Sequence, residues 1–366
     1  MAGSGFGTNF RITTWGETHG AGVGVVVDGC PAGLPLERED VQKYLDRRKP
    51  GQSKYTTQRK EGDQVEILSG IFEGRTTGTP ISMVVYNKDQ RSKDYSNIKD
   101  IYRPGHADFT FDMKYGFRDY RGGGRSSGRE TIGRVAAGAV AAKVLKELGI
   151  EIKAYAKAIA GIEVSKDHFD FAEMNNNPFN MPDKEAAKLV QEKADQMIKE
   201  MDSIGGIIEC QITGMPVGIG ETVFDKLDAE LSKAIMSIGS VKGFEIGDGF
   251  EAANLRGSEN NDDFICFDGK VAKETNHSGG VLGGMSDGSA IVFRAAIKPT
   301  PSIAQTQKTV NRDLDNVEIE IHGRHDPMIV PRAVVVVESM AAVTILDGVL
   351  KNLGATMDNI KKIYGE

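Results

Sequence analysis

One short stretch of the chain gathers the side chains best suited to hold a small, strongly anionic ligand. Residues 103–134 contain six arginines, a lone histidine (His106) and three consecutive glycines at 122–124. Arginine binds phosphate and carboxylate groups through paired hydrogen bonds, and glycine lets a backbone approach a ligand closely. Histidine is the side chain whose ordinary pKa suits proton transfer near neutral pH. The stretch therefore predicts an anion-binding site that contains a proton donor or acceptor.

Histidines outside this stretch offer one further candidate for proton transfer. The chain has six histidines, and His19, in GETHG, adjoins a glycine as His106 does in RPGHAD. His168 lies in a polar loop, where we expect a structural role. The sequence shows no HxH or HExxH pattern and no CxxC among its three separated cysteines. Neither a metal site nor a disulfide framework is therefore predicted.

Two glycine-rich segments resemble nucleotide-binding loops in spacing but not in context. The glycines at 20–24 follow a GxGxG pattern and precede a strand instead of a helix, so they form either a tight hairpin or a ligand-facing loop. GGGRSSGRE has GxxxxG spacing, but Arg129 and Glu130 stand where a phosphate loop needs Lys and Ser or Thr. The segment leads directly into a helix, whose N-terminal amides can receive an anion. Ser126 and Ser127 lack the context of a nucleophile elbow, which argues against acyl-enzyme chemistry.

The composition is that of a globular protein with an acidic balance. Its 366 residues carry a formal net charge of −7 and give a pI of about 5.6, which should repel nucleic acid and anionic membranes. RNA binding through RGGGR is an alternative, but such elements act within long basic, disordered tracts. The first residues lack the pattern of a signal peptide, and no apolar run approaches the roughly 20 residues of a membrane span. We expect a cytoplasmic protein that binds neither nucleic acid nor membranes.

Hydrophobic periodicity and turn residues predict an α+β chain around these candidates. We expect strands over 9–15, 25–28, 65–74, 79–87, 150–165 and 205–220, and helices over 35–49, 130–149, 183–201, 225–239 and 331–354. Residues 47–60 should form a basic polar loop, and 241–264 an irregular glycine-rich loop.

The two halves of the chain contain similar sequence patterns. THGAGVGVVVDG resembles NHSGGVLGGMSDGSAIVF, and a helix of small residues follows in each half. This favours a duplicated α+β unit with halves of roughly 1–200 and 201–366. Because no Pro- or Ser-rich linker separates the halves, we expect one composite domain over 1–366.

At the level of motifs, the chain resembles the chorismate synthase family. The resemblance covers essentially the whole chain and is carried by TTWGETHG, DRRKPGQSKYTTQRKE, DQRSKDYS, RPGHADFTFDMKYGFRDYRGGGRSSGRET, DSIGG, RGSENND, NHSGGVLGG, KPTPSI and GRHDPM. Two positions depart from the family pattern. Met328 stands where relatives usually have Cys, and Lys54 where many have Arg, which exchanges a bidentate contact for a point charge.

The resemblance implies a fold and a reaction. The family fold is a helical layer sandwiched between antiparallel sheets, with two pseudo-repeated halves, and it assembles as a homotetramer. Its members convert 5-enolpyruvylshikimate 3-phosphate to chorismate, the last common step of the shikimate pathway, by an anti-1,4-elimination of phosphate and a ring hydrogen. They require reduced FMN although the reaction has no net redox change. An FMN-dependent oxidoreductase, which would consume reductant in proportion to product, is the alternative.

The source of reduced flavin is a further expectation from the resemblance. Some family members reduce their own flavin with NADPH. This chain has no room for an added flavodoxin-like domain, so we expect an external flavin reductase, with NADPH as an indirect reductant.

The resemblance also assigns roles to individual residues. His19 is expected to protonate or hydrogen-bond the leaving phosphate, and His106 to protonate the flavin system. Asp326 would help the flavin N5 receive the C6 hydrogen, and a plain ion pair with Arg324 is the alternative for it.

Two further groups of residues are expected to bind ligands. Those for the phosphate and carboxylates of the substrate are Arg48, Lys54, Arg103, Arg129 and Arg134, the first two of which could instead contact a nucleotide. Those for FMN are Arg125, Ser126, Ser127, Gly239, Ser240, Gly283, Lys298, Pro299, Thr300, Pro301, Ser302 and Arg324.

Overall fold

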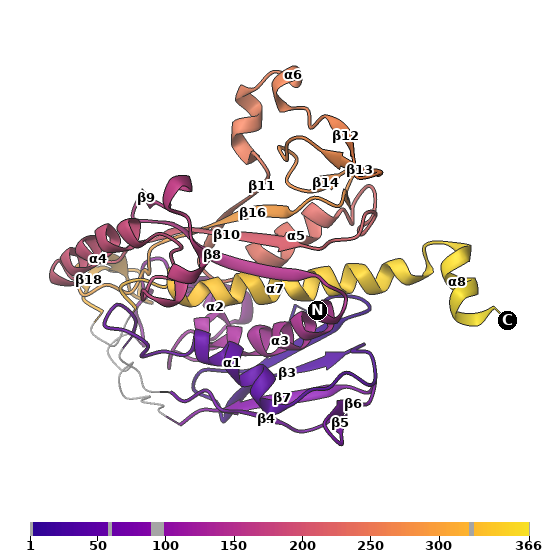
Figure 1. Cartoon of the computed structure of the whole chain (residues 1–366). Helices are drawn as coiled ribbons and strands as arrows, with labels where there is room; N and C mark the ends of the chain where they lie inside the picture. The colour runs from indigo at the N-terminus through magenta and orange to yellow at the C-terminus, as the bar shows by residue number, and fades with distance from the viewer. Residues whose placement is uncertain (1–2, 58–60, 89–98, 322–325, 366) are drawn as a thin grey trace.

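Two antiparallel sheets of five strands each, with helices between them, form the body of the chain (Figure 1). The computed structural model describes residues 3–57, 61–88, 99–321 and 326–365. The first sheet has the order β1 (Gly5–Phe6), β2 (Arg11–Gly16), β3 (Gly22–Asp28), β7 (Ile81–Tyr86) and β4 (Val65–Ile67). The combination of helices and antiparallel sheets confirms the predicted α+β class.

The second sheet comes from the middle and the later part of the chain. Its order is β11 (Val241–Ile246), β16 (Ile291–Ile297), β10 (Gly206–Thr213), β8 (Glu151–Ile159) and β9 (Ile162–Glu163). The prediction that 241–264 is wholly irregular is wrong at its start. β11 includes a glycine that interrupts the strand pattern, but the ladder to β16 satisfies its backbone polar groups.

The glycines at 20–24 belong to a hairpin, one of the two predicted alternatives. β2 and β3 pair antiparallel, with Trp15 opposite Gly24 in the register. A Cβ on Gly24 would lie 2.5 Å from the ring of Trp15, so glycine is required there because the indole packs against the neighbouring backbone.

Helices α3 (Thr131–Glu147) and α7 (Val330–Lys351) lie between the sheets (Figure 1). α3 contacts β2, β3 and β7, α7 contacts β8 and β10, and the two helices contact each other. Their small and β-branched residues allow close packing. At the crossing, a Cβ added to Gly138 would lie 2.3 Å from the Cβ of Ser339.

α7 is long and apolar enough to cross a membrane by length and composition, so the expectation that no such run exists is wrong. Most of the helix is nevertheless buried against protein. Its buried carboxylates are also paired inside the fold: Glu338 receives two hydrogen bonds of 2.8 Å from Arg47. Such packing is that of a core helix.

α1 (Arg38–Arg48) lies within the predicted helix 35–49, and it overlaps the start of the predicted loop 47–60. Arg47 and Arg48 form its last turn instead of belonging to a loop, and Arg48 is buried. The helix packs against α3 and α7, which brings Arg48 toward the middle of the molecule.

The other elements are shorter or lie at the periphery. Surface helix α4 (Lys184–Lys199) and α5 (Leu227–Met236) agree with prediction. The remaining helices and strands are α2 (Asp108–Tyr115), α6 (Gly257–Asn260), α8 (Met357–Tyr364), β5 (Ile71–Phe72), β6 (Arg75–Thr76), β12 (Phe264–Phe267), β13 (Lys270–Lys273), β14 (Val281–Leu282), β15 (Met285–Ser286), β17 (Gln307–Val310) and β18 (Asn316–Ile319), with short 3-10 helices at Gly124–Ser126, Gly128–Glu130, Lys166–His168, Phe171–Asn175, Gly249–Asn254 and Asn352–Gly354.

Candidate active site

A cavity of about 970 Å³ brings separated segments of the chain together. The stretch 103–134, the connection 237–242, residues 298–302 and the first turn of α7 all border it. The predicted site residues that line it are Arg48, Arg103, His106, Arg125, Ser126, Ser127, Arg134, Gly239, Ser240, Lys298, Thr300, Pro301, Ser302 and Asp326.

The structure does not bring every predicted residue to this cavity. Lys54 is exposed and forms an ion pair of 2.7 Å with Asp195 on α4. Gly283 lies in the turn between β14 and β15, and Pro299 is exposed. Arg324 lies outside the described residues. His19 and Arg129 do not line the cavity either, and Asn87 links Arg129 to the turn that carries His19.

Two of the lining arginines are held in place by carboxylates. Arg103 donates from Nε and Nη2 to the two carboxylate oxygens of Asp108, at 2.8 Å each. Arg134 donates from Nε to Glu130, at 2.8 Å, and from Nη1 to the hydroxyl of Ser237, at 2.6 Å. These guanidinium groups are oriented before any ligand arrives, so little side-chain entropy remains to be lost on binding.

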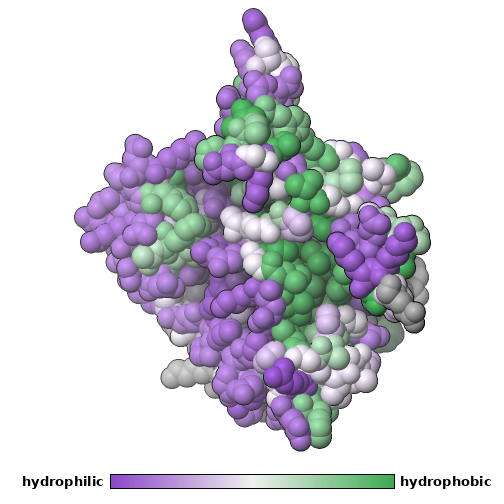
Figure 2. Space-filling model, turned by 45° about the vertical axis from the view of Figure 1, so that its right-hand side comes forward, coloured by the Kyte–Doolittle hydropathy of each residue, from purple (hydrophilic) through white to green (hydrophobic). Residues whose placement is uncertain are grey.

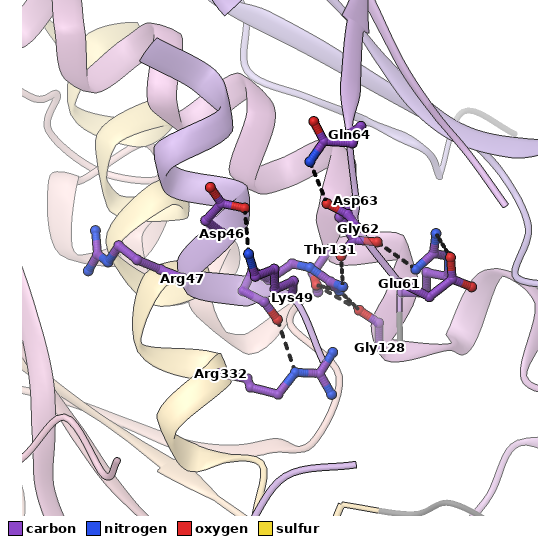
Figure 3. A network of polar contacts seen from close by, with 12 residues as sticks. Asp46, Arg47, Lys49, Glu61, Gly62, Asp63, Gln64, Gly128, Thr131 and Arg332 are labelled. Carbon is purple, nitrogen blue, oxygen red and sulfur yellow. Dashed lines mark hydrogen bonds and ion pairs between the residues drawn. The ribbon is translucent and has the colours of Figure 1, made fainter. Parts of the chain in front are cut away.

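Arg48 is held by a buried network whose partners Asp63, Gly128 and Thr131 are labelled in Figure 3. Its Nη2 donates to Asp63 at 2.7 Å, and its Nη1 donates to the Gly128 carbonyl and the Thr131 hydroxyl, both at 3.3 Å. Burial is the main cause that lowers the pKa of Arg48 to about 10; Asp63 opposes this effect, whereas Arg332 and Arg129 add to it. Arg48 is therefore cationic at neutral pH.

Arg129 does not border the cavity, although its neighbours Gly128 and Glu130 do. Its Nη1 donates to Asp63 at 2.8 Å, and its Nε donates to the side-chain oxygen of Asn87 at 2.6 Å. Asn87 in turn donates to the carbonyls of Glu17 and Gly20, both at 2.9 Å.

His19 lies between those two carbonyl groups, in the turn from β2 to β3. Its neighbour Glu17 borders the cavity, as does Asp119. Arg121 is the main cause that lowers the pKa of Asp119, and His19 contributes to the same shift. The turn with His19 is thus beside the cavity rim and is tied through Asn87 to Arg129.

His106 is held by one hydrogen-bonding group at each ring nitrogen. Its Nδ1 lies 2.9 Å from the Pro104 carbonyl oxygen and its Nε2 lies 2.8 Å from the Ser302 hydroxyl. Burial is the largest cause that lowers its pKa, followed by the charge of Arg103, and Lys298 adds to the effect. The imidazole is therefore mainly neutral at pH 7.

Asp326 is engaged by two donors within the described residues. Its Oδ1 accepts from the backbone amide of Thr57 at 2.7 Å, and its Oδ2 accepts from Nη1 of Arg332 at 2.6 Å. Arg332 also donates from Nε to the carbonyl of Arg48 at 3.0 Å. The alternative ion pair with Arg324 falls outside the described residues.

The wall around 123–128, 239–240 and 298–302 has the features that a flavin phosphate site needs. A Cβ added to Gly124, Gly128 or Gly239 would meet nothing within 4 Å, so space is open beside the backbone. The hydroxyl of Thr300 is buried and has no hydrogen-bond partner among the described residues. Together with the cations Arg125 and Lys298 at the same cavity, these open backbone positions and the spare hydroxyl fit FMN.

Several lining residues were missed from the sequence. Lys242 and Arg332 add cations, and Phe111, Tyr115 and Phe117 add aromatic rings. Arg332 had a signal, since it is the one charged residue in the apolar segment PRAVVVV. Within the described parts of the chain, no group of three His, Cys, Asp or Glu side chains could hold a metal ion.

Comparisons with known proteins agree over the length of the chain. The family model described as chorismate synthase matches residues 10–350. The chorismate synthase of Lachnospira eligens is 68% identical over 364 residues and covers 100% of both chains. That of Methanococcoides burtonii is 56% identical over 355 residues, which are 96% of this chain and 97% of the relative.

A solved structure gives the same result at the level of the fold. A structure named as the crystal structure of chorismate synthase has a TM-score of 0.77 and 31% sequence identity, and the match covers 98% of this chain and 96% of that one. With the family model and the relatives of high identity, this makes the chain a carbon–oxygen lyase acting on a phosphate, and a member of the chorismate synthase family.

Proposed function

We propose that this chain converts 5-enolpyruvylshikimate 3-phosphate to chorismate by an anti-1,4-elimination that depends on reduced FMN. The observation that carries the proposal is the cavity bordered by Arg48, Arg103, Arg134 and His106. A substrate with one phosphate and two carboxylates explains this surplus of cations in a protein whose net charge is −7.

Different residues of the chain would act on different steps of the elimination. The bond between the ring carbon and the phosphate oxygen breaks, a ring hydrogen leaves from the opposite face, and a new double bond completes the diene. We assign His19 to protonate or hydrogen-bond the departing phosphate, because its turn lies beside the cavity rim and is fixed by Asn87. The arginines stabilise the negative charge that grows on the phosphate as the bond breaks.

Reduced FMN, when bound, supplies the electron-rich ring that assists loss of phosphate and receives the ring hydrogen. Arg125, Ser126 and Ser127 would hold its phosphate side, and Lys298, Thr300 and Ser302 would line its other side, with Ser240, Gly239 and Pro301 completing the wall. We assign His106, which borders the same cavity, to protonate the flavin system, and Asp326, fixed by Thr57 and Arg332, presents a carboxylate to this cavity.

Anaerobic incubation of the chain with reduced FMN and 5-enolpyruvylshikimate 3-phosphate tests the proposal. Phosphate and chorismate should appear in equal amounts, because one elimination releases one of each. Absence of both products would overturn the proposed function. Counting reductant separates it from an FMN-dependent oxidoreductase: the lyase needs reduced flavin only catalytically, whereas an oxidoreductase consumes one reductant for each product.

Self-association is part of the proposal, as a homotetramer. Exposed large apolar side chains support it, among them Phe224 at 88%, Phe250 at 81% and Val271 at 79% exposure. Figure 2 shows apolar side chains gathered along the middle of one face among polar ones. Apolar surface of this kind on a folded protein marks an interaction site.

The proposal also covers the domain organisation of the chain, its location in the cell and its partners. We take 1–366 as one composite domain in the family sandwich with two pseudo-repeated halves. Each half contributes one long helix of small and β-branched residues, and the first sheet comes wholly from the first half. The second sheet joins β10, β11 and β16 of the second half to β8 and β9 of the first, which supports one composite domain. We also propose a cytoplasmic location, without nucleic acid or membrane partners, and an external flavin reductase that uses NADPH.

A further inference from the structure

We propose that Asp63 is a positioning residue of the substrate site, an inference that rests on the proposed function. Its carboxylate joins two cations: Arg48, which borders the cavity and is expected to bind substrate, and Arg129, which does not border it. Oδ2 lies 2.7 Å from Nη2 of Arg48, and Oδ1 lies 2.8 Å from Nη1 of Arg129. Asp63 does not itself border the cavity, so it acts through these arginines.

Charge and burial make this carboxylate necessary. The side chain of Asp63 is 0% exposed and that of Arg48 is 2% exposed. Arg129 and Arg332 are both near enough to act electrostatically on Arg48. Without a counter-charge these cations would repel one another in a region of low dielectric constant. By binding one nitrogen of each, Asp63 fixes the spacing between Arg48 and Arg129.

The same contacts leave one nitrogen of Arg48, Nε, without a partner among the described residues. Its Nη1 and Nη2 bind protein groups, whereas its Nε is buried and has no hydrogen-bond partner among the described residues. A buried donor without a partner is costly. An oxygen of the anionic substrate would satisfy it, provided that Asp63 keeps the guanidinium in this orientation.

The backbone at Asp63 is suited to hold the carboxylate there. Its φ of 42° is left-handed, a conformation that Asp and Asn adopt more readily than most residues. Gln42, on the same helix as Arg48, donates to the Asp63 carbonyl at 3.2 Å and accepts from the amide of Val65 at 3.0 Å. Asp63 is thereby fixed to the helix that carries its partner.

A second path leads from Asp63 to the turn with His19. Arg129 donates to both Asp63 and Asn87, and Asn87 binds the carbonyls on the two sides of His19. One carboxylate therefore supports a binding group, Arg48, and the turn that carries the proposed acid. Loss of its charge should weaken substrate binding first and turnover second.

The test is Asp63→Asn in the full chain, which keeps the size of the side chain and its tolerance of positive φ. Calorimetric titration of the flavin-free protein with 5-enolpyruvylshikimate 3-phosphate should show a dissociation constant raised about tenfold or more, the scale of one lost charge-assisted hydrogen bond. KM should rise by a larger factor than kcat falls. Asp268→Asn is the matched control: Asp268 also has a left-handed φ, of 51°, but it is exposed and does not border the cavity.

A double-mutant cycle separates positioning from general support of the fold. In an Arg48→Ala background, Asp63→Asn should change the dissociation constant by less than about threefold, because the group that it positions is gone. An equal penalty in both backgrounds would overturn the proposal. If Asp63→Asn does not fold, Gln42→Ala releases the Asp63 backbone without changing a charge, and it should weaken substrate binding several-fold.

The outcomes distinguish this inference from the proposed function. A wild-type chain that neither binds the substrate nor forms chorismate overturns both. A wild-type chain that does both, with Asp63→Asn binding the substrate equally well, overturns the role of Asp63 alone. Unchanged binding in Gln42→Ala has the same consequence where Asp63→Asn does not fold.

Discussion

His106 and Ser302 are joined by a hydrogen bond of 2.8 Å between Nε2 and Oγ, although 196 positions separate them in the sequence. The other ring nitrogen, Nδ1, lies 2.9 Å from the Pro104 carbonyl oxygen, which can only accept. In the neutral imidazole the proton is therefore on Nδ1, and Nε2 accepts from the Ser302 hydroxyl. His106, on the side of the site where FMN is proposed to bind, therefore has one defined tautomer.

Replacing Ser302 with alanine should lower turnover about tenfold, because Nε2 loses the donor that fixes the orientation of the ring. His106→Ala should lower it by about 10²–10⁴, the usual contribution of a positioned acid or base. Initial rates of chorismate formation at saturating flavin measure both. Ser69→Ala, whose hydroxyl binds the Pro80 carbonyl outside the cavity, is the control. A wild-type rate in Ser302→Ala would refute the role of this hydrogen bond.

The pKa of His106 should lie below its ordinary value of 6.5, first because the ring is buried and then because Arg103 and Lys298 are positive. Lys298→Met should raise this pKa only in part, since burial remains. In the wild type, the unfolded chain binds more protons than the folded one as the pH falls below 6.5, so stability decreases in that range. NMR titration of the imidazole tests the prediction, and a pKa above 6.5 in the wild type would contradict it.

The sequence was sufficient for the elements whose signals are local. α3 and α7 were predicted because runs of small and β-branched residues mark buried helices, and α4 because its amphipathic pattern marks a surface helix. β11 was missed because its stability comes from pairing with β16, a strand about fifty residues later. Local patterns carry no information about such a partner.

The same limit applies to the site. Candidate arginines and histidines can be recognised in the sequence from their residue type alone. The groups that orient their side chains cannot, because they lie far away in the sequence. Asp63 is 66 positions from Arg129, and Asn87 is 42 positions from it. Arg48 was placed in a loop because RRKPG looks polar. Tertiary packing of α1 against α3 and α7 buries it instead.

Asp347→Ala should destabilise the fold by about 3 kcal/mol or more, because it leaves a group of backbone amides without an acceptor. One carboxylate oxygen of Asp347 accepts from the amides of Thr8, Asn9 and Phe10 at 2.6–2.9 Å and so ties the start of the chain to α7. Urea unfolding measures the loss. Asp358→Ala, at an exposed position in α8, should change the free energy of unfolding little, and an equal loss in the two variants would contradict this account.

Gly138→Ala should destabilise the protein by about 1–3 kcal/mol, the usual cost of overpacking. Alanine is the better helix former by about 1 kcal/mol, but its Cβ would lie 2.3 Å from the Cβ and 2.5 Å from the Cα of Ser339. The matched control is Gly348→Ala on α7, where the nearest atom is the end of the Ile219 side chain at 3.2 Å. Thermal unfolding should show Gly138→Ala as the less stable variant, and the reverse order would disprove the close-packing argument.

Asn87→Ala should lower turnover with little change in substrate affinity, since Asn87 fixes the turn of His19 but does not border the cavity. His19→Ala should lower turnover by about 10²–10⁴, because it removes the proposed acid. Asn87→Ala should lower turnover by a smaller factor, because the acid is still present. In the double variant the two losses should not add, because a fixed turn is of no use without its imidazole. Single-turnover rates with pre-reduced FMN give the comparison, with the exposed Asn176→Ala as control. Additive losses would show that Asn87 acts through Arg129 and substrate binding instead of through the turn that carries His19.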